Sequence, residues 1–275
     1  CPAPSAPSGS SAHLGPAMPA PRPAPRVWFV RDALGIGCAA VAWLLVLGAA
    51  GLLLRELLLP CGDAAYAAAN GALFLALATL GLAAHARTML TDPGSVPRGD
   101  PPGSRAAPRC ALCASAKPAG THHCSVCGRC IRRRDHHCPW VNNCVGEDNQ
   151  KYFVLFTLYT ALASLHLLLL LGVPVLRRFA RGEWTMHSTV SPGTSLFLLF
   201  MVALKGFFLA SVMFVMQVYA ICSGAQRLQR DEGRWGKGSK WANVKAVFGH
   251  RVSVAWISPF APPDLQRARG HHYVV

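Results

Sequence analysis

Seven cysteines and four histidines lie within one short segment, between Cys110 and Cys144. They occupy positions 110, 113, 122, 123, 124, 127, 130, 136, 137, 138 and 144. Three of the cysteine steps skip two residues, a gap that lets both thiolates reach one tetrahedral ion. Two closed zinc sites need eight ligands, so three of these side chains remain for other chemistry. Residues 91–130 contain few large apolar side chains, so we expect this segment to need metal to fold.

Four apolar blocks flank this segment, at about 33–54, 64–84, 152–176 and 195–222. Each is long enough to cross a bilayer as a helix, which takes ~20 residues, whereas barrel strands need only ~10. A buried soluble helix is the alternative for the second block, which is rich in alanine. The sequence therefore predicts an all-α integral membrane protein with four transmembrane helices. A loop-rich, two-zinc domain would lie between the second and third.

The basic residues indicate which side of the membrane this domain faces. Residues 87–151 hold ten Lys and Arg against five acidic residues, and nine more basic residues follow Cys222. Because Lys and Arg accumulate on the cytosolic side, both termini and the central domain are predicted to be cytosolic. The net charge of +15 then suits anionic lipid headgroups rather than nucleic acid. A reducing cytosol also disfavours disulfides, which leaves metal binding or catalysis for the cysteines.

Several motifs resemble the DHHC-type protein S-acyltransferases, the palmitoyltransferases. The signature is Asp135-His136-His137-Cys138, continued by Pro139 to Gly146. Residues 92–94 (Asp-Pro-Gly) and Asn243 within 241–249 also match family motifs. The segments 28–32, 151–156 and 273–275 are most similar to Golgi-type members, which implies the Golgi or another endomembrane. The stretch from Cys222 to Gln226 departs from the family's TTxE-like motif.

The resemblance implies how the metal ligands divide. One structural zinc would take Cys110, Cys113, His123 and Cys130, and the other Cys124, Cys127, His137 and Cys144. Both sets are complete, so neither ion has the open position that a catalytic zinc keeps. Cys138, His136 and His122 remain.

The resemblance also implies a two-step acyl transfer. Cys138 would attack a fatty acyl-CoA, typically palmitoyl-CoA, and pass the acyl group to a protein cysteine. His136 is the candidate base and Asp135 its orienting carboxylate, by the logic of catalytic triads. Alternatively, His136 binds zinc and Asp135 is a solvated charge. Arg132, Arg133 and Arg134 would bind CoA phosphates, or form only a membrane-facing basic run, and Trp140 would contact the acyl chain.

The expected organisation is a disordered Pro- and Ala-rich tail (1–26), two membrane helices (27–90), the zinc domain (91–151), two further helices (152–222) and a cytosolic C-terminal domain (223–275). The expected partners are membrane-associated protein substrates with cytosolic cysteines, acyl-CoA, the lipid bilayer and a PDZ domain that binds Tyr273-Val274-Val275. The small Ala163, if it lines an acyl cavity, would admit chains longer than palmitoyl. Competing hypotheses are a non-catalytic zinc-containing scaffold and an ion transporter, but only Lys205 and His166 are ionisable deep in the spans.

Overall fold

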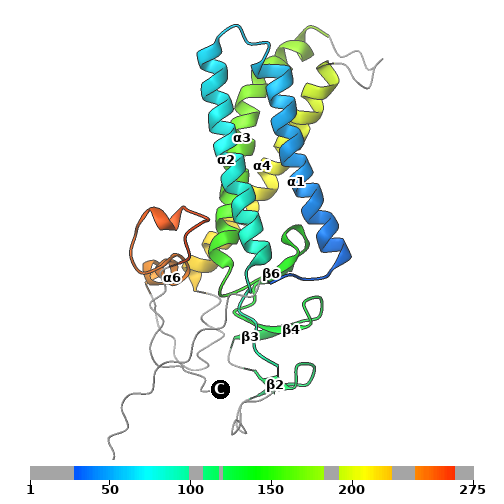
Figure 1. Cartoon of the computed structure of the whole chain (residues 1–275). Coiled ribbons are helices and arrows are strands. Elements are labelled where there is room, and N and C mark those ends of the chain that lie inside the picture. Colours follow the sequence, from blue (N-terminus) through cyan, green and yellow to red (C-terminus); the bar gives the residue numbers. More distant parts are fainter. Residues whose placement is uncertain (1–27, 99–107, 118–119, 183–191, 225–238, 264–275) are drawn as a thin grey trace, which may run out of the picture.

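Four long helices form an upright bundle in the computed structural model, which describes residues 28–98, 108–117, 120–182, 192–224 and 239–263 (Figure 1). They are α1 (Ala33–Leu53, continued by the π-helical turn η1, Leu54–Leu58), α2 (Ala64–Leu90), α3 (Gln150–Ala180) and α4 (Pro192–Ser223). All four are long and apolar enough to cross a membrane, which confirms the four-span prediction. The first helix runs four residues beyond the predicted end.

Polar caps and small residues set the helix ends and spacing. The carboxylates of Asp32 and Asp63 accept backbone N–H groups in the first turns of α1 and α2, and these donors have no intrahelical partner. Gly81 of α2 lies against Tyr159 of α3, and Gly206 of α4 lies against Ser164. A missing Cβ at such points lets membrane helices approach closely.

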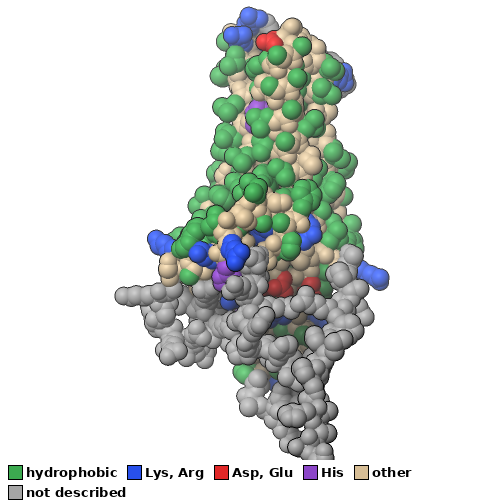
Figure 2. Space-filling view, turned by 60° about the vertical axis from the view of Figure 1, so that its left-hand side comes forward, with side chains coloured by type: hydrophobic (Ala, Val, Ile, Leu, Met, Phe, Trp, Pro, Cys, Tyr) green, Lys and Arg blue, Asp and Glu red, His purple; other side chains and the backbone are tan. Residues whose placement is uncertain are grey.

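The bundle core lies away from the cysteine-rich domain and takes residues from all four helices. Its members include Leu53, Phe74, Leu171 and Leu199, all at most 3% exposed. The outer surface is also apolar, and basic side chains gather at the two ends of this apolar column (Figure 2). A surface of this kind suits contact with lipid.

Three short antiparallel hairpins form the cysteine-rich domain at one end of the bundle, which we call its foot (Figure 1). The strands are β1 (Arg109–Cys110) with β2 (Ser115–Ala116), β3 (Thr121–Cys124) with β4 (Arg129–Arg132), and β5 (His136–Cys138) with β6 (Asn143–Val145). A 3-10 turn, η2 (Pro139–Val141), joins the last pair. The domain is as loop-rich as predicted, and its small buried clusters consist mainly of cysteines.

The C-terminal segment, with α6 (Lys240–Phe248) and η3 (Val254–Trp256), also packs at the foot of the bundle. The buried Lys151 donates from Nζ to the carbonyls of Ala255 and Ala261, both at 2.7 Å. Asn243 donates to the carbonyl of Cys222 near the end of α4. The predicted disordered tail and the predicted PDZ ligand, Tyr273-Val274-Val275, lie outside the described residues.

Candidate active site and metal clusters

The first group of candidate metal ligands gathers around the imidazole of His123. The sulfurs of Cys113, Cys110 and Cys130 lie 3.2, 3.7 and 3.9 Å from its Nδ1. A tetrahedral zinc, with Zn–S ~2.3 Å and Zn–N ~2.0 Å, would separate sulfur from nitrogen by about 3.5 Å. The donor set and its spacing therefore fit one zinc ion.

The second group has the same form around Nδ1 of His137. The sulfurs of Cys127, Cys144 and Cys124 lie 3.4, 3.7 and 3.8 Å from that nitrogen. Within each group, the four ligand atoms all lie within 4.8 Å of one another. The structure thus brings together both predicted sets of four.

Hairpin register explains why the two sets interleave along the chain. His123 lies directly opposite Cys130, while its neighbour Cys124 points to the other face of the same strand. In the next hairpin His137 lies opposite Cys144. The alternation therefore turns the residues on either side of His137, which are His136 and Cys138, to the face away from the second cluster.

Crowded thiols make these clusters suitable for a cation. Burial and the neighbouring Cys110 thiol raise the pKa of Cys130 to about 12, and the Cys124 thiol raises that of Cys144 to about 11. One thiol in each group, Cys110 or Cys124, has a lowered pKa, and its neighbours are then hindered from ionising, so a divalent cation would be needed to hold all of them as thiolates. Burial lowers the pKa of Arg134, but the hydrogen bond to Cys144 and the charges of the second cluster's cysteines together outweigh it and raise the pKa. A zinc ion with three thiolates carries a net negative charge, which this guanidinium would balance.

The other face of β5 carries the imidazole of His136 and the thiol of Cys138, and the carboxylate of Asp135 precedes the strand. Oδ2 of Asp135 lies 2.9 Å from Nδ1 of His136. Burial favours the neutral ring, yet hydrogen bonding and charge from Asp135 and Cys138 raise the pKa of His136 to about 9. Cys138 is 7% exposed and packs with Val141, Val145 and Phe153. Among the described cysteines from 110 to 144, Cys138 alone belongs to neither cluster.

Comparison with known proteins decides the family. A family model described as DHHC palmitoyltransferase matches residues 105–231. The chain is 50% identical to "Palmitoyltransferase ZDHHC3" of Rattus norvegicus over 94% of this chain and 91% of the relative, and 49% identical to the Homo sapiens protein of that name over the same shares. Identity to "Palmitoyltransferase ZDHHC7" of Mus musculus is 44%, over 89% of this chain and 84% of the relative.

The chain belongs to the DHHC palmitoyltransferase family. It is therefore a multi-pass membrane enzyme, a protein S-palmitoyltransferase, and its family uses acyl-CoA. This confirms the predicted fold class and enzyme class, and it sets aside the scaffold and transporter hypotheses.

The three arginines before the DHHC signature have different surroundings. Arg132 is bound on three sides, by Glu147 and Asp148, each at 2.8 Å, and by the carbonyl of Ser95 at 3.3 Å. Arg133 makes a longer ion pair, with Glu147 at 3.6 Å. Arg134 interacts with the cysteines of the second cluster. Arg132 thus ties β4 to the loop before α3, a role that the sequence did not suggest.

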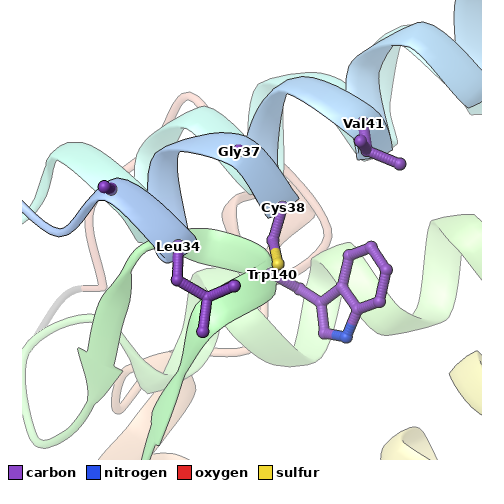
Figure 3. Close-up of a pocket in the computed structure, with 6 residues that line it drawn as sticks. Leu34, Gly37, Cys38, Val41 and Trp140 are labelled. Carbon is purple, nitrogen blue, oxygen red and sulfur yellow. The ribbon is translucent and has the colours of Figure 1, made fainter.

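Trp140, two residues after Cys138, is held through its backbone. Its carbonyl accepts a hydrogen bond from Nε2 of His85 at 2.8 Å, and Nδ1 of His85 accepts from the indole of Trp43 at 3.1 Å. The Trp140 indole is 47% exposed and lines a hollow of about 300 Å³ against the start of α1, facing Cys38 (Figure 3). The indole thus forms one wall of a mainly apolar hollow beside α1.

Three asparagines connect the cysteine-rich domain to the membrane helices by hydrogen bonds, and the sequence did not predict these roles. Asn142 donates to the carbonyl of Val30 at 2.7 Å, just before α1. Asn143 donates to the carbonyls of Thr88, Met89 and Thr91 at the end of α2, and Asn149 also donates to Thr88. The last carbonyls of a helix have no intrahelical donors, so these amides satisfy them. The one feature of the sequence that could have indicated these roles is the occurrence of three asparagines within eight residues.

Proposed function

We propose that Cys138 is the acyl-carrying nucleophile of this palmitoyltransferase, with His136 as its base and Asp135 as the orienter. The observation that carries this proposal is the Asp135–His136 contact of 2.9 Å on the strand face that also holds Cys138. A carboxylate on Nδ1 of an imidazole fixes the ring and stabilises its charged form. The other ring nitrogen, Nε2, is buried and has no hydrogen-bond partner among the described residues, and interaction with Cys138 helps to raise the pKa of the ring.

The reaction proceeds in two balanced steps. His136 holds the proton of the Cys138 thiol while the thiolate attacks the carbonyl carbon of palmitoyl-CoA. The CoA sulfur leaves and takes up that proton, so Cys138 becomes a thioester. A substrate thiol then loses its proton to His136 and attacks the same carbonyl carbon. Cys138 leaves as a thiolate and recovers the proton.

The surroundings of Cys138 suit a fatty acyl thioester. Phe153 of α3 and Met213 of α4 pack beside it, so the acyl chain would enter apolar surroundings at the foot of the bundle. Each CH₂ kept from water contributes ~0.8 kcal/mol. Trp140 supplies a further apolar face. Among the arginines, Arg133 has the weakest competing ion pair and is the best candidate for a CoA phosphate.

The eight clustered ligands would hold two structural zinc ions, supplying folding energy to the domain. We place both termini and the active site on the cytosolic face, where membrane-associated proteins would present their cysteines. The Lys and Arg bias supports this side. The Golgi-type resemblance of residues 28–32 and 151–156 supports a Golgi or other endomembrane location. A PDZ partner for Tyr273-Val274-Val275 stays a prediction.

Autoacylation tests the nucleophile. The purified, zinc-loaded chain is incubated with labelled palmitoyl-CoA and then treated with neutral hydroxylamine, which cleaves thioesters. Wild type should carry hydroxylamine-sensitive label, and Cys138→Ser should carry none. Cys222→Ser is the matched control, because Cys222 lies at the end of α4 outside both clusters, and it should label as wild type does. Hydroxylamine-sensitive label on Cys138→Ser at the wild-type level would overturn the assignment.

A further inference from the structure

A buried pair of amides connects the bundle to the Asp135 carboxylate. Nε2 of Gln217, in α4, donates to Oδ2 of Asp135 at 2.6 Å. Nε2 of Gln150, the first residue of α3, donates to Oε1 of Gln217 at 3.2 Å. Gln217 is 3% exposed and Gln150 is 4% exposed. The hydrogen bonds therefore run from Gln150 to Gln217 to Asp135 and meet His136 at the same oxygen.

The carboxylate determines how both amides are turned. An ionised carboxylate can only accept, so the amide nitrogen of Gln217 must face Asp135. Its oxygen is then left to accept from Gln150, whose amide nitrogen must face Gln217. Every link has a donor and an acceptor, so the chain has one consistent direction. A satisfied polar chain of this kind holds its members in one arrangement.

Burial of two polar amides in this place is costly unless they form hydrogen bonds. Met213, one turn before Gln217 in α4, packs on the apolar cluster around Cys138, and Phe153, one turn after Gln150, belongs to that cluster. Apolar residues at 217 and 150 would pack there without a desolvation penalty. The polar choice thus points to a requirement for a donor to Asp135.

We propose that Gln217 is a positioning residue for acyl transfer, which fixes the Asp135 carboxylate so that its Oδ2 meets His136. His136 and Gln217 approach the same oxygen from β5 and from α4, so the carboxylate is held between the domain and the bundle. Asp135 itself lies in the connection between β4 and β5, outside both strands. A support on a rigid helix gives the precision that a catalytic group on a loop lacks. The inference rests on the proposed roles of Asp135, His136 and Cys138.

Single-turnover autoacylation of the full-length, zinc-loaded enzyme separates positioning from a merely structural role. Gln217→Met keeps the side-chain length and removes the donor. We expect the first-order rate constant with labelled palmitoyl-CoA to fall about 10- to 100-fold, while the final amplitude and the KM for palmitoyl-CoA stay at wild-type values. Gln150→Met, which only loosens Gln217, should reduce the rate constant about 2- to 10-fold.

Thr157→Val is the matched control, because it removes another buried polar group from α3, whose hydroxyl, within the described part of the chain, donates to the carbonyl of Val154 and does not contact Asp135. It should leave the rate constant unchanged. A wild-type rate constant in Gln217→Met would overturn the inference, and so would a reduced amplitude with a normal rate constant. If Gln217→Met loses its zinc, Gln150→Met decides by the same two readouts. A wild-type chain that takes no label would overturn the proposed function, so the two failures are distinguishable.

Discussion

The cysteine-rich domain and the helical bundle are stabilised by different means. The domain has strands of two to four residues, and its buried clusters are made mainly of cysteines that could hold metal ions. The bundle has helices of more than twenty residues and a core of leucine, alanine and phenylalanine. Backbone hydrogen bonds inside each helix suit the bilayer without further partners. We therefore expect one region to depend on bound ions for its fold and the other to depend on packing.

Cys138 lies where these two regions meet, in a small apolar cluster that Phe153 of α3 and Met213 of α4 join. Polar side chains cross the boundary between the regions: Asn143 from the domain to the end of α2, and Gln217 from α4 to Asp135. Such bonds are directional, so they fix an orientation that packing alone would leave loose. We therefore expect the geometry around Cys138 to require both regions to be folded and correctly joined.

Zinc removal should have the largest effect, and it should act on the cysteine-rich domain but not on the bundle. Structural zinc contributes about 10–16 kcal/mol in zinc-dependent peptides, far more than the small core of residues 91–151 supplies. A strong chelator should therefore unfold the DHHC domain and abolish autoacylation, while the membrane helices keep their helicity. Circular dichroism in detergent measures the helices, and limited proteolysis between Cys110 and Cys144 measures the domain.

His137→Ala removes one ligand of the second cluster and should lower the zinc content and expose the domain to proteolysis. His122→Ala is the matched control, because His122 lies between the clustered residues in sequence yet belongs to neither cluster. A chelated protein with an intact, protease-resistant domain would contradict the metal-dependent fold.

Asn143→Ala tests the boundary itself. The substitution leaves the carbonyls of Met89 and Thr91 without this amide donor, while that of Thr88 keeps Asn149, and the loss should cost about 1–3 kcal/mol. The thermal unfolding midpoint of the zinc-loaded protein should fall, and the autoacylation rate should fall with it. Asn70→Ala is the control, because its amide bonds one exposed carbonyl within α2. An equal midpoint for Asn143→Ala and wild type would show that this boundary adds no stability.

Sequence patterns could predict the spans, because ~20 apolar residues have few other uses. The eight clustered ligands followed from family resemblance, whereas their spacing alone left the division open. Strand alternation around His137 supplies the physical reason, but strands this short carry no hydrophobic period from which to predict them. Gln217 and Asn143 went unrecognised since each bonds to a residue more than 50 positions away. Arg132 was predicted to bind CoA, but a CoA phosphate would have to compete with its two carboxylate partners, Glu147 and Asp148.

Ala163→Phe tests the role of the bundle and should affect acyl chain-length specificity rather than stability. Ala163 of α3 is half-buried against the core shared by all four helices, so a larger side chain would shorten any space that receives the end of an acyl chain. Discrimination by one or two methylenes amounts to about 10-fold or more, and the ratio of stearoyl to palmitoyl transfer should fall accordingly. Competition between the two labelled acyl-CoAs measures that ratio. Leu169→Phe places the same ring on the outer face of α3, where Leu169 is 70% exposed, and should leave the ratio unchanged. An Ala163→Phe enzyme with the wild-type ratio would show that the bundle near Ala163 does not measure the chain, and that chain length is selected closer to Cys138.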